Sequence, residues 1–280
     1  MEFINLLLNL LAWWLWAGAF VFPRYAVRSS QPLTLLSTLR SESPQGFGRY
    51  VLLVALLGLI GLRAVAYWNF APPGSALPQL DFGIVSVSFR TDSLAQMGCY
   101  SVASFAVFLY VYYLCVFGLS LTCRQRTRVD SIENLVNQQL NRAAYWHPGI
   151  KLAAGTGGGV LIWIIFGAIM VRLGALPGDW SFGTLLLQSP IMAASLWLFF
   201  VIVVLGVIAF HLLHSYVYLG EQALWKFIDE CAKFYLSPFR SLPLLVGRFD
   251  FSPILGILVY WFGLELGDWV LRIAFARVAA

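Results

Sequence analysis

Charge is what this sequence lacks most. Only 11% of its 280 residues are Asp, Glu, Lys or Arg, whereas 60% are hydrophobic. Soluble domains carry roughly 25% charged residues, so a water-soluble core could not hide this much apolar surface. The 18 basic residues exceed the 13 acidic ones only slightly and are dispersed, which argues against direct contact with nucleic acid. The composition therefore predicts an integral membrane protein.

Recognisable catalytic and metal-binding patterns are also missing. The four cysteines show no C-x-x-C spacing, so we expect no structural disulfide. The glycine run at 155–159 lacks the Lys-Ser/Thr ending of a phosphate loop, and we interpret it as a close-packing surface between spans. His211 and His214 lie one helical turn apart, with His147 at a matching membrane level; these three could bind a metal or haem, or form hydrogen bonds at the membrane boundary. We predict no enzyme activity and no cofactor.

Long apolar runs, in contrast, are abundant. Six runs have about the ~20 residues that a helix needs to cross a bilayer core. The predicted spans are residues 3–22, 50–68, 96–121, 152–172, 191–216 and 253–271. The first is expected to be an anchor and not a cleaved leader, because Glu2 stands where a leader has a basic region. The predicted fold class is an all-α membrane protein with about six transmembrane helices.

The cations are distributed unevenly between the connections. Of the 18 Lys and Arg residues, 13 lie in the segments 23–49, 122–151 and 217–252. Lys and Arg are enriched in cytoplasmic loops, so these connections are predicted to face the cytoplasm. Both chain termini then lie on the non-cytoplasmic side.

Two of these connections contain an amphipathic segment, at 130–146 and 221–236. Neither is apolar enough to span, so we expect helices that lie in the membrane interface or pack on the cytoplasmic ends of the spans. A Tyr-x-x-Pro sequence closes each segment, at 145–148 and 235–238, and the two copies are 90 residues apart. Proline should stop each helix because it lacks the N–H that continuation requires.

The order of parts also occurs twice. Span, outer loop, long span and amphipathic segment follow one another in 49–150 and again in 151–280. Because both copies begin on the same side, we predict two parallel repeats. Residues 1–48 form an added anchor span and a cytoplasmic linker.

A few polar residues fall at or between the spans. Arg63, Arg172, Glu265 and Asp268 lie near predicted span ends, where we expect them to snorkel or pair at the outer interface. Residues 81–89 alternate apolar and Ser residues, which predicts a short extended element that either contacts a partner or covers the helix ends.

The segment 234–254, which leads into the last span, is the most distinctive stretch. Its motif residues are Pro238, Phe239, Arg240, Pro243, Gly247, Asp250, Phe251, Ser252 and Pro253. Pro243 and Gly247 supply fixed and permissive backbone angles for a reversal back into the membrane. Ser252 can cap the last span and Pro253 fits its first turn, while Asp250 adds negative charge at the positive helix end.

This motif resembles the signature of the YggT family of bacterial and plastid integral membrane proteins. The resemblance covers about 150–271, with a degenerate first copy at about 50–148. Ser241 stands where the family commonly has a second basic residue, and Arg248 where it commonly has Gly. We expect the motif residues, Arg240 above all, to contact lipid phosphate or a partner.

The resemblance implies a scaffold or assembly factor for a membrane complex or the cell envelope, in the bacterial cytoplasmic (inner) membrane. The alternative is a small-solute or ion transporter or channel component involved in osmotic response. The expected partners are the lipid bilayer and other membrane protein subunits or further copies of the chain, with no direct nucleic acid contact.

Overall fold

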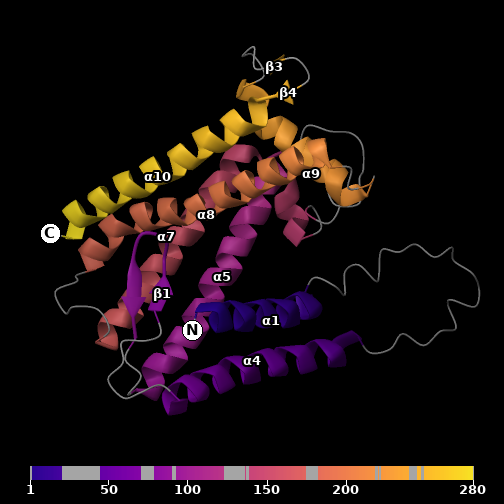
Figure 1. Ribbon diagram of the computed structural model, residues 1–280. Coiled ribbons are helices and arrows are strands. Elements are labelled where there is room, and N and C mark those ends of the chain that lie inside the picture. The colour runs from indigo at the N-terminus through magenta and orange to yellow at the C-terminus, as the bar shows by residue number, and fades with distance from the viewer. Residues whose placement is uncertain are drawn as a thin grey trace, which may run out of the picture. The chain divides into compact units, whose positions relative to one another are not determined.

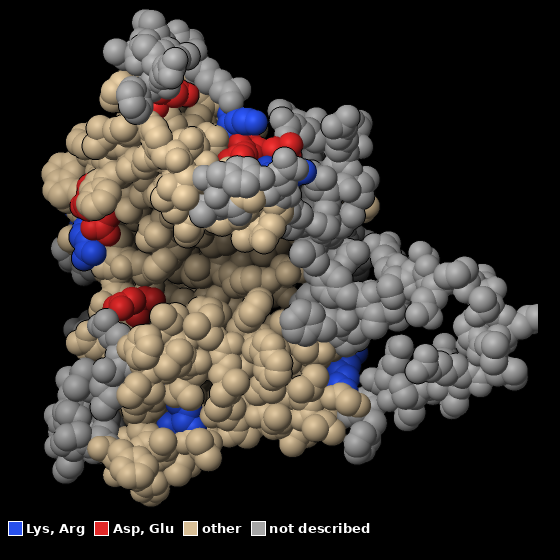
Figure 2. All heavy atoms as spheres, turned by 45° about the vertical axis from the view of Figure 1, so that its right-hand side comes forward, with Lys and Arg blue, Asp and Glu red and all other residues tan. Residues whose placement is uncertain are grey.

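The computed structural model shown in Figure 1 describes residues 2–20, 45–70, 79–89, 93–122, 136, 139–174, 182–217, 220, 222–239, 245–246 and 249–279. Within these residues, six helices are long and apolar enough to cross a membrane. This confirms the predicted all-α fold of a multi-pass membrane protein. Most of the described surface seen in Figure 2 is uncharged, as a hydrocarbon solvent requires.

The six long helices are α1 (Glu2–Phe20), α4 (Gln45–Phe70), α5 (Leu94–Thr122), α7 (Pro148–Arg172), α8 (Phe182–Tyr216) and α10 (Ser252–Ala279). The shorter elements are β1 (Gln79–Asp81), β2 (Ser86–Ser88), η2 (Asn141–Tyr145), α9 (Ala223–Tyr235), η3 (Ser237–Phe239), β3 (Leu245–Val246) and β4 (Phe249–Asp250). The strands form two separate two-stranded sheets, β1 with β2 and β3 with β4.

The chain divides into two compact units. Unit 1 comprises Met1–Leu80, Val87–Leu109 and Leu173–Ala175, and unit 2 comprises Asp81–Ser86, Tyr110–Arg172 and Leu176–Ala280. The sequence analysis divides the chain differently, into 1–48, 49–150 and 151–280, on the basis of a repeated order of segments. That division stays a prediction.

Unit 1 is built on the contact between α1 and α4. Ala12 of α1, Leu56 of α4 and Phe105 of α5 form its buried apolar cluster. Phe89, which follows β2, is fully buried and packs edge-on against Tyr100 of α5. The other faces of α1 and α4 carry exposed Leu, Val and Phe side chains, as expected for helices in contact with lipid.

Unit 2 is organised around α8, which packs against α7, α9 and α10 (Figure 1). Val204 and Ile208 of α8 form a buried cluster with Cys231 and Tyr235 of α9 and with Leu236. The amino group of Lys151 is buried and donates a hydrogen bond to the Ser120 hydroxyl of α5, at 3.0 Å.

Helix α8 begins at Phe182, nine residues before the predicted start at residue 191. Proline interrupts a helix in water because it removes the hydrogen bond to the carbonyl four residues earlier. In a membrane helix the carbonyl freed by proline can be satisfied by a Ser or Thr side chain. Here the Ser189 hydroxyl donates to the Leu186 carbonyl at 2.8 Å, so the helix continues through Pro190.

The glycine run of α7 is a close-packing surface, as predicted. A Cβ added to Gly159 would lie 3.0 Å from the Ala193 Cβ and 3.1 Å from its Cα, both on α8. A Cβ on Gly155 would lie 2.8 Å from the Trp197 ring. Gly157, on another side of the same helix, has nothing within 4 Å. Small residues at 155 and 159 therefore bring α7 against α8.

The extended element predicted at 81–89 exists as strand β2 and the turn before it. Residues 86–89 alternate between exposed serines and buried Val87 and Phe89. Gly83 has a positive φ of 74°, and a Cβ there would lie 2.7 Å from the Ser195 hydroxyl of α8. Phe82 is buried against the rings of Trp163 and Phe166. In unit 2 the turn therefore covers the sides of α7 and α8, whereas the sequence predicts either a cover over helix ends or a partner contact.

The second amphipathic segment forms α9, whose buried face, including Cys231 and Ala232, lies against α8. Leu224 and Phe234 of α9 remain exposed and are available to the lipid boundary. Residues 130–135, 137 and 138 of the first segment lie outside the described residues. Val136 and Leu140 of this segment share an apolar cluster with Phe227 of α9, so both segments lie at the same end of unit 2.

The two proline stops behave differently. Pro238 follows the end of α9 and lies in η3, as expected for a helix terminator. Pro148 instead opens α7, and the first segment has already ended in η2. Pro148 suits a first helical position because the missing N–H would be unpaired there anyway. The ring nitrogen Nδ1 of His147 accepts the Gly149 N–H at 3.3 Å and so caps this helix start.

We expect Gly159→Ala to destabilise unit 2 and Gly157→Ala to leave it unchanged or slightly more stable. The added methyl at 159 overpacks the α7–α8 contact, at a cost of about 1–3 kcal/mol. The methyl at 157 meets open space and gains about 0.5–1 kcal/mol of helix propensity. Thermal unfolding of both variants in detergent tests this, and equal melting temperatures would refute the glycine contact.

Candidate functional site

The described part of the signature loop joins α9 to the start of α10. The Phe239 ring packs edge-on against Tyr260 of α10, and the Tyr260 hydroxyl donates to the Tyr235 carbonyl at 3.2 Å. A Cβ on Gly256 would lie 2.5 Å from the Leu236 side chain, so α10 approaches the end of α9 closely. These contacts fix where α10 begins relative to α9.

The start of α10 has the charge arrangement that the sequence predicted. The Asp250 carboxylate accepts the backbone N–H of Ser252 at 2.8 Å, and Pro253 lies in the first turn. Asp250 thus supplies the oxygen at the start of α10, a role that we had assigned to the hydroxyl of Ser252. Arg240, Pro243 and Gly247 lie outside the described residues, as does Arg248.

His211 and His214 converge on a carboxylate that the sequence analysis did not single out. Their Nδ1 atoms lie 2.7 and 3.0 Å from the two carboxylate oxygens of Asp229 on α9. The ring of Trp225 stacks on His214 with a centroid distance of 5.5 Å. The i, i+3 spacing of the two histidines predicted that they share one side of a helix. Asp229 lies in the polar face of a different helix, so spacing along the chain could not reveal it.

This histidine–carboxylate cluster is a tether between two helices. No group of three metal-ligating side chains suited to a metal ion occurs among the described residues. His147 instead caps α7. The two hydrogen bonds hold the polar edge of α9 to α8, and whether the histidines also bind a ligand stays open.

Arg63 does not snorkel, contrary to the sequence-based expectation. Its side chain is buried in unit 1, with only 4% of its surface exposed. The guanidinium donates to Asn9 Oδ1 at 2.8 Å, Asn5 Oδ1 at 3.2 Å, the Ser104 hydroxyl at 3.1 Å and the Tyr100 hydroxyl at 3.3 Å. The four neutral oxygens of α1 and α5 satisfy the two terminal nitrogens of the guanidinium inside the unit, while Nε has no hydrogen-bond partner among the described residues.

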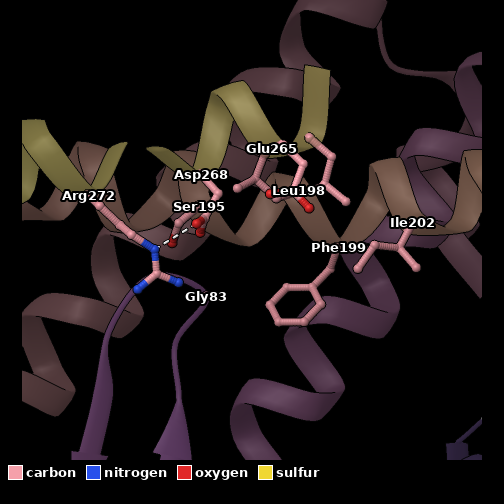
Figure 3. A pocket seen from close by; sticks show the side chains of 9 residues that line it. Gly83, Ser195, Leu198, Phe199, Ile202, Glu265, Asp268 and Arg272 are labelled. Carbon is pink, nitrogen blue, oxygen red and sulfur yellow. Dashed lines mark hydrogen bonds and ion pairs between the residues drawn. The ribbon is translucent and has the colours of Figure 1, made fainter. Parts of the chain in front are cut away.

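A cleft between α8, α10 and the turn at Gly83 contains further charges of the candidate spans (Figure 3). It encloses about 240 Å³ and is lined by apolar residues of α8 together with Glu265, Asp268 and Arg272 of α10. Asp268 accepts from Arg272 at 2.6 Å, and Arg272 also donates to the Ile84 carbonyl at 3.4 Å. These two charges form the predicted kind of pair, though along one helix.

Glu265 lacks such a partner within the described part of the chain. It is exposed and lies at the midpoint of the candidate span 252–278, because α10 extends eight residues beyond the predicted end at 271. The expectation that Glu265 lies near a span end is therefore wrong. A charged side chain at the centre of a spanning helix costs about 2.5–3.5 kcal/mol on insertion scales and is usually functional.

The fold and these sites define a multi-pass α-helical membrane protein. Comparisons with family models, curated proteins and solved structures find no match to this chain.

We expect Asp229→Ala to loosen α9 from α8. Hydrogen bonds to a charged group contribute about 1.5–3 kcal/mol, so amide exchange across α9 should accelerate by about tenfold or more. Hydrogen exchange with mass spectrometry measures this. Lys233→Ala is the control, because it removes one exposed charge from the same helix outside the cluster. Equal exchange in the two variants would show that the cluster does not hold α9 to α8.

We expect Arg63→Leu to destabilise unit 1 by about 2–3 kcal/mol, since interhelical hydrogen bonds in membranes average about 0.6 kcal/mol each and this change removes four. Thermal unfolding in detergent, followed by tryptophan fluorescence, reports the change. Arg172→Leu, at an exposed helix end, should have little effect. Identical melting curves for the two variants would contradict a structural role for the buried guanidinium.

Proposed function

We propose that this chain is an integral membrane scaffold or assembly factor of the YggT type, for a membrane complex or the cell envelope. We place it in the bacterial cytoplasmic membrane, with both termini on the non-cytoplasmic side. The signature motif and the uneven distribution of cations support this assignment. No catalytic arrangement stands out among the described residues, so the proposal is one of binding and organisation.

The observation that carries the proposal is the exposed surface of α10. Only 6% of its spanning window is buried, less than in any of the other five candidate spans. Its exposed large side chains are Leu258, Val259, Trp261, Phe262, Leu266, Trp269 and Val270. Aromatic side chains are typical of interface anchors between proteins. We call this surface the α10 face.

The neighbouring elements hold α10 in a defined place, as a scaffold requires. Helix α8 packs along it, and the end of α9 closes on its first turns through Leu236 and Phe239. A surface fixed from two sides loses little conformational freedom when a partner binds, which favours affinity.

Transport of a small solute or ion is the second candidate function. The cleft lined by Glu265, Asp268 and Arg272 favours it, because charged groups inside a membrane mark substrate and ion pathways in transporters. Ion or solute flux into vesicles containing the purified protein separates the two functions, since a scaffold alone would produce none.

We predict that the double variant Trp261→Ala/Trp269→Ala loses a partner that co-purifies with the chain from native membranes in mild detergent. Both tryptophans are 60% exposed and lie on the α10 face. Their removal takes two large contact surfaces from the interface, and hot-spot truncations cost about 2 kcal/mol or more each.

The control is Trp14→Ala on α1, because Trp14 is exposed to a similar extent, 59%, in another span. The partner should be retained by this variant. Recovery of the same partner in the same amount from the double variant and the control would reject a scaffold role for the α10 face.

A further inference from the structure

Glu265 carries an exposed carboxylate near the middle of a candidate span, where lipid supplies neither a hydrogen-bond donor nor a counter-charge. It lies 13 residues from each end of the candidate span 252–278, which is about 20 Å of helix in either direction. Hydrocarbon tails supply neither hydrogen-bond donors nor counter-charge. A carboxylate kept at this position therefore requires a donor from another source.

The cation nearest along α10 is already engaged. Arg272 bonds to Asp268 at 2.6 Å and to the carbonyl of Ile84 at 3.4 Å. In Figure 3 its guanidinium points toward Asp268 and the turn, while Glu265 lies on the other side of Asp268. The cleft thus contains one neutralised carboxylate and one carboxylate without a partner among the described residues.

Apolar surface surrounds Glu265 on α10. Phe262 and Leu266, its neighbours three residues before and one after, are 68% and 46% exposed, and Trp261 and Trp269 lie one turn away on either side. Residues three and four apart share a side of a helix, so Trp261, Glu265 and Trp269 form one stripe. A stripe of this kind fits the side of a second helix.

We propose that the α10 face receives a transmembrane helix of a different protein that carries a Lys or Arg at the depth of Glu265. This inference rests on the proposed scaffold function and names the chemistry of the partner. The cation would share the cleft with Glu265, and the flanking tryptophans would pack on the apolar surface of the incoming helix.

A second copy of the chain fits this surface poorly. Copies with the same topology are related by an axis along the membrane normal, so in a twofold contact between two α10 faces each residue lies at the same depth as its equivalent. Glu265 would then face Glu265. The cations of α10, Arg272 and Arg277, lie about 10 and 18 Å further along the helix axis, too far to compensate.

The test uses the full chain in phosphatidylcholine vesicles with synthetic transmembrane peptides. One peptide is an all-Leu helix of about 21 residues with a central Lys. A second has Leu at that position, and a third has the Lys displaced by seven residues, about 10 Å. Energy transfer between labelled protein and labelled peptide gives the association constants.

We expect the central-Lys peptide to bind about tenfold more tightly than the other two, as close charge pairs at interfaces do. Glu265→Gln should abolish this preference, and Glu265→Lys should reverse it toward a peptide with a central Glu. Glu230→Gln, on α9, is the control for net charge and should retain the preference. Equal binding of the Lys and Leu peptides, or a preference that survives Glu265→Gln, would overturn the proposal.

A photo-crosslinker placed at Phe262 in native membranes completes the test. A crosslink to another segment of the same chain, or to a second copy, would overturn the proposal by showing what covers the face. If the tryptophan double variant loses its partner while the peptides bind alike, the scaffold function stands and only the cation is withdrawn. If Lys binding is confirmed but no partner is lost, the scaffold function fails instead.

Discussion

The hydrocarbon solvent supplies no hydrogen bonds, and this constraint explains how several polar groups in the described helices are packed. Arg63 meets it with four neutral oxygens from α1 and α5, and Lys151 meets it with the Ser120 hydroxyl. Ser189 meets it for the carbonyl that Pro190 leaves open. Glu265 stands apart from these cases because no described residue supplies its donor. Because lipid tails cannot donate a hydrogen bond, a carboxylate without a donor in the described chain points to an interaction with another molecule.

The apolar pattern of the sequence predicted the six spans and the all-α membrane fold well, because length and hydropathy are enough to recognise a spanning helix. Two of the differences occur at prolines. Helix α8 begins at Phe182 and continues through Pro190, and Pro148 begins α7 although it was expected to end the first amphipathic segment. In both places a neighbouring side chain, Ser189 or His147, supplies a hydrogen bond that composition alone does not reveal.

The candidate sites were harder to predict than the helices because they join residues distant in sequence. The spacing of His211 and His214 indicated a shared helix side, yet Asp229 completes their cluster from another helix. The sequence pattern around Arg63 is typical of an interfacial cation, because its partners Asn5 and Asn9 come from a distant part of the chain. The described signature residues, by contrast, were predictable from the local sequence, because Asp250 and Ser252 are only two residues apart. The repeat, the orientation and the family resemblance stay predictions.

The central position of α8 in unit 2 has a consequence for biosynthesis. Helix α7 is made first, so Gly155 and Gly159 enter the bilayer before their partner surface on α8 exists. Helices α9 and α10 are made later and dock on α8 in turn. Every tertiary contact of this unit through α8 therefore waits for one segment of nascent chain. Until then the glycine surface of α7 can pack only on earlier segments, such as α5, whose Tyr110 hydroxyl donates to the Gly155 carbonyl. Translocation machinery that retains α7 until α8 arrives would protect that surface from premature association.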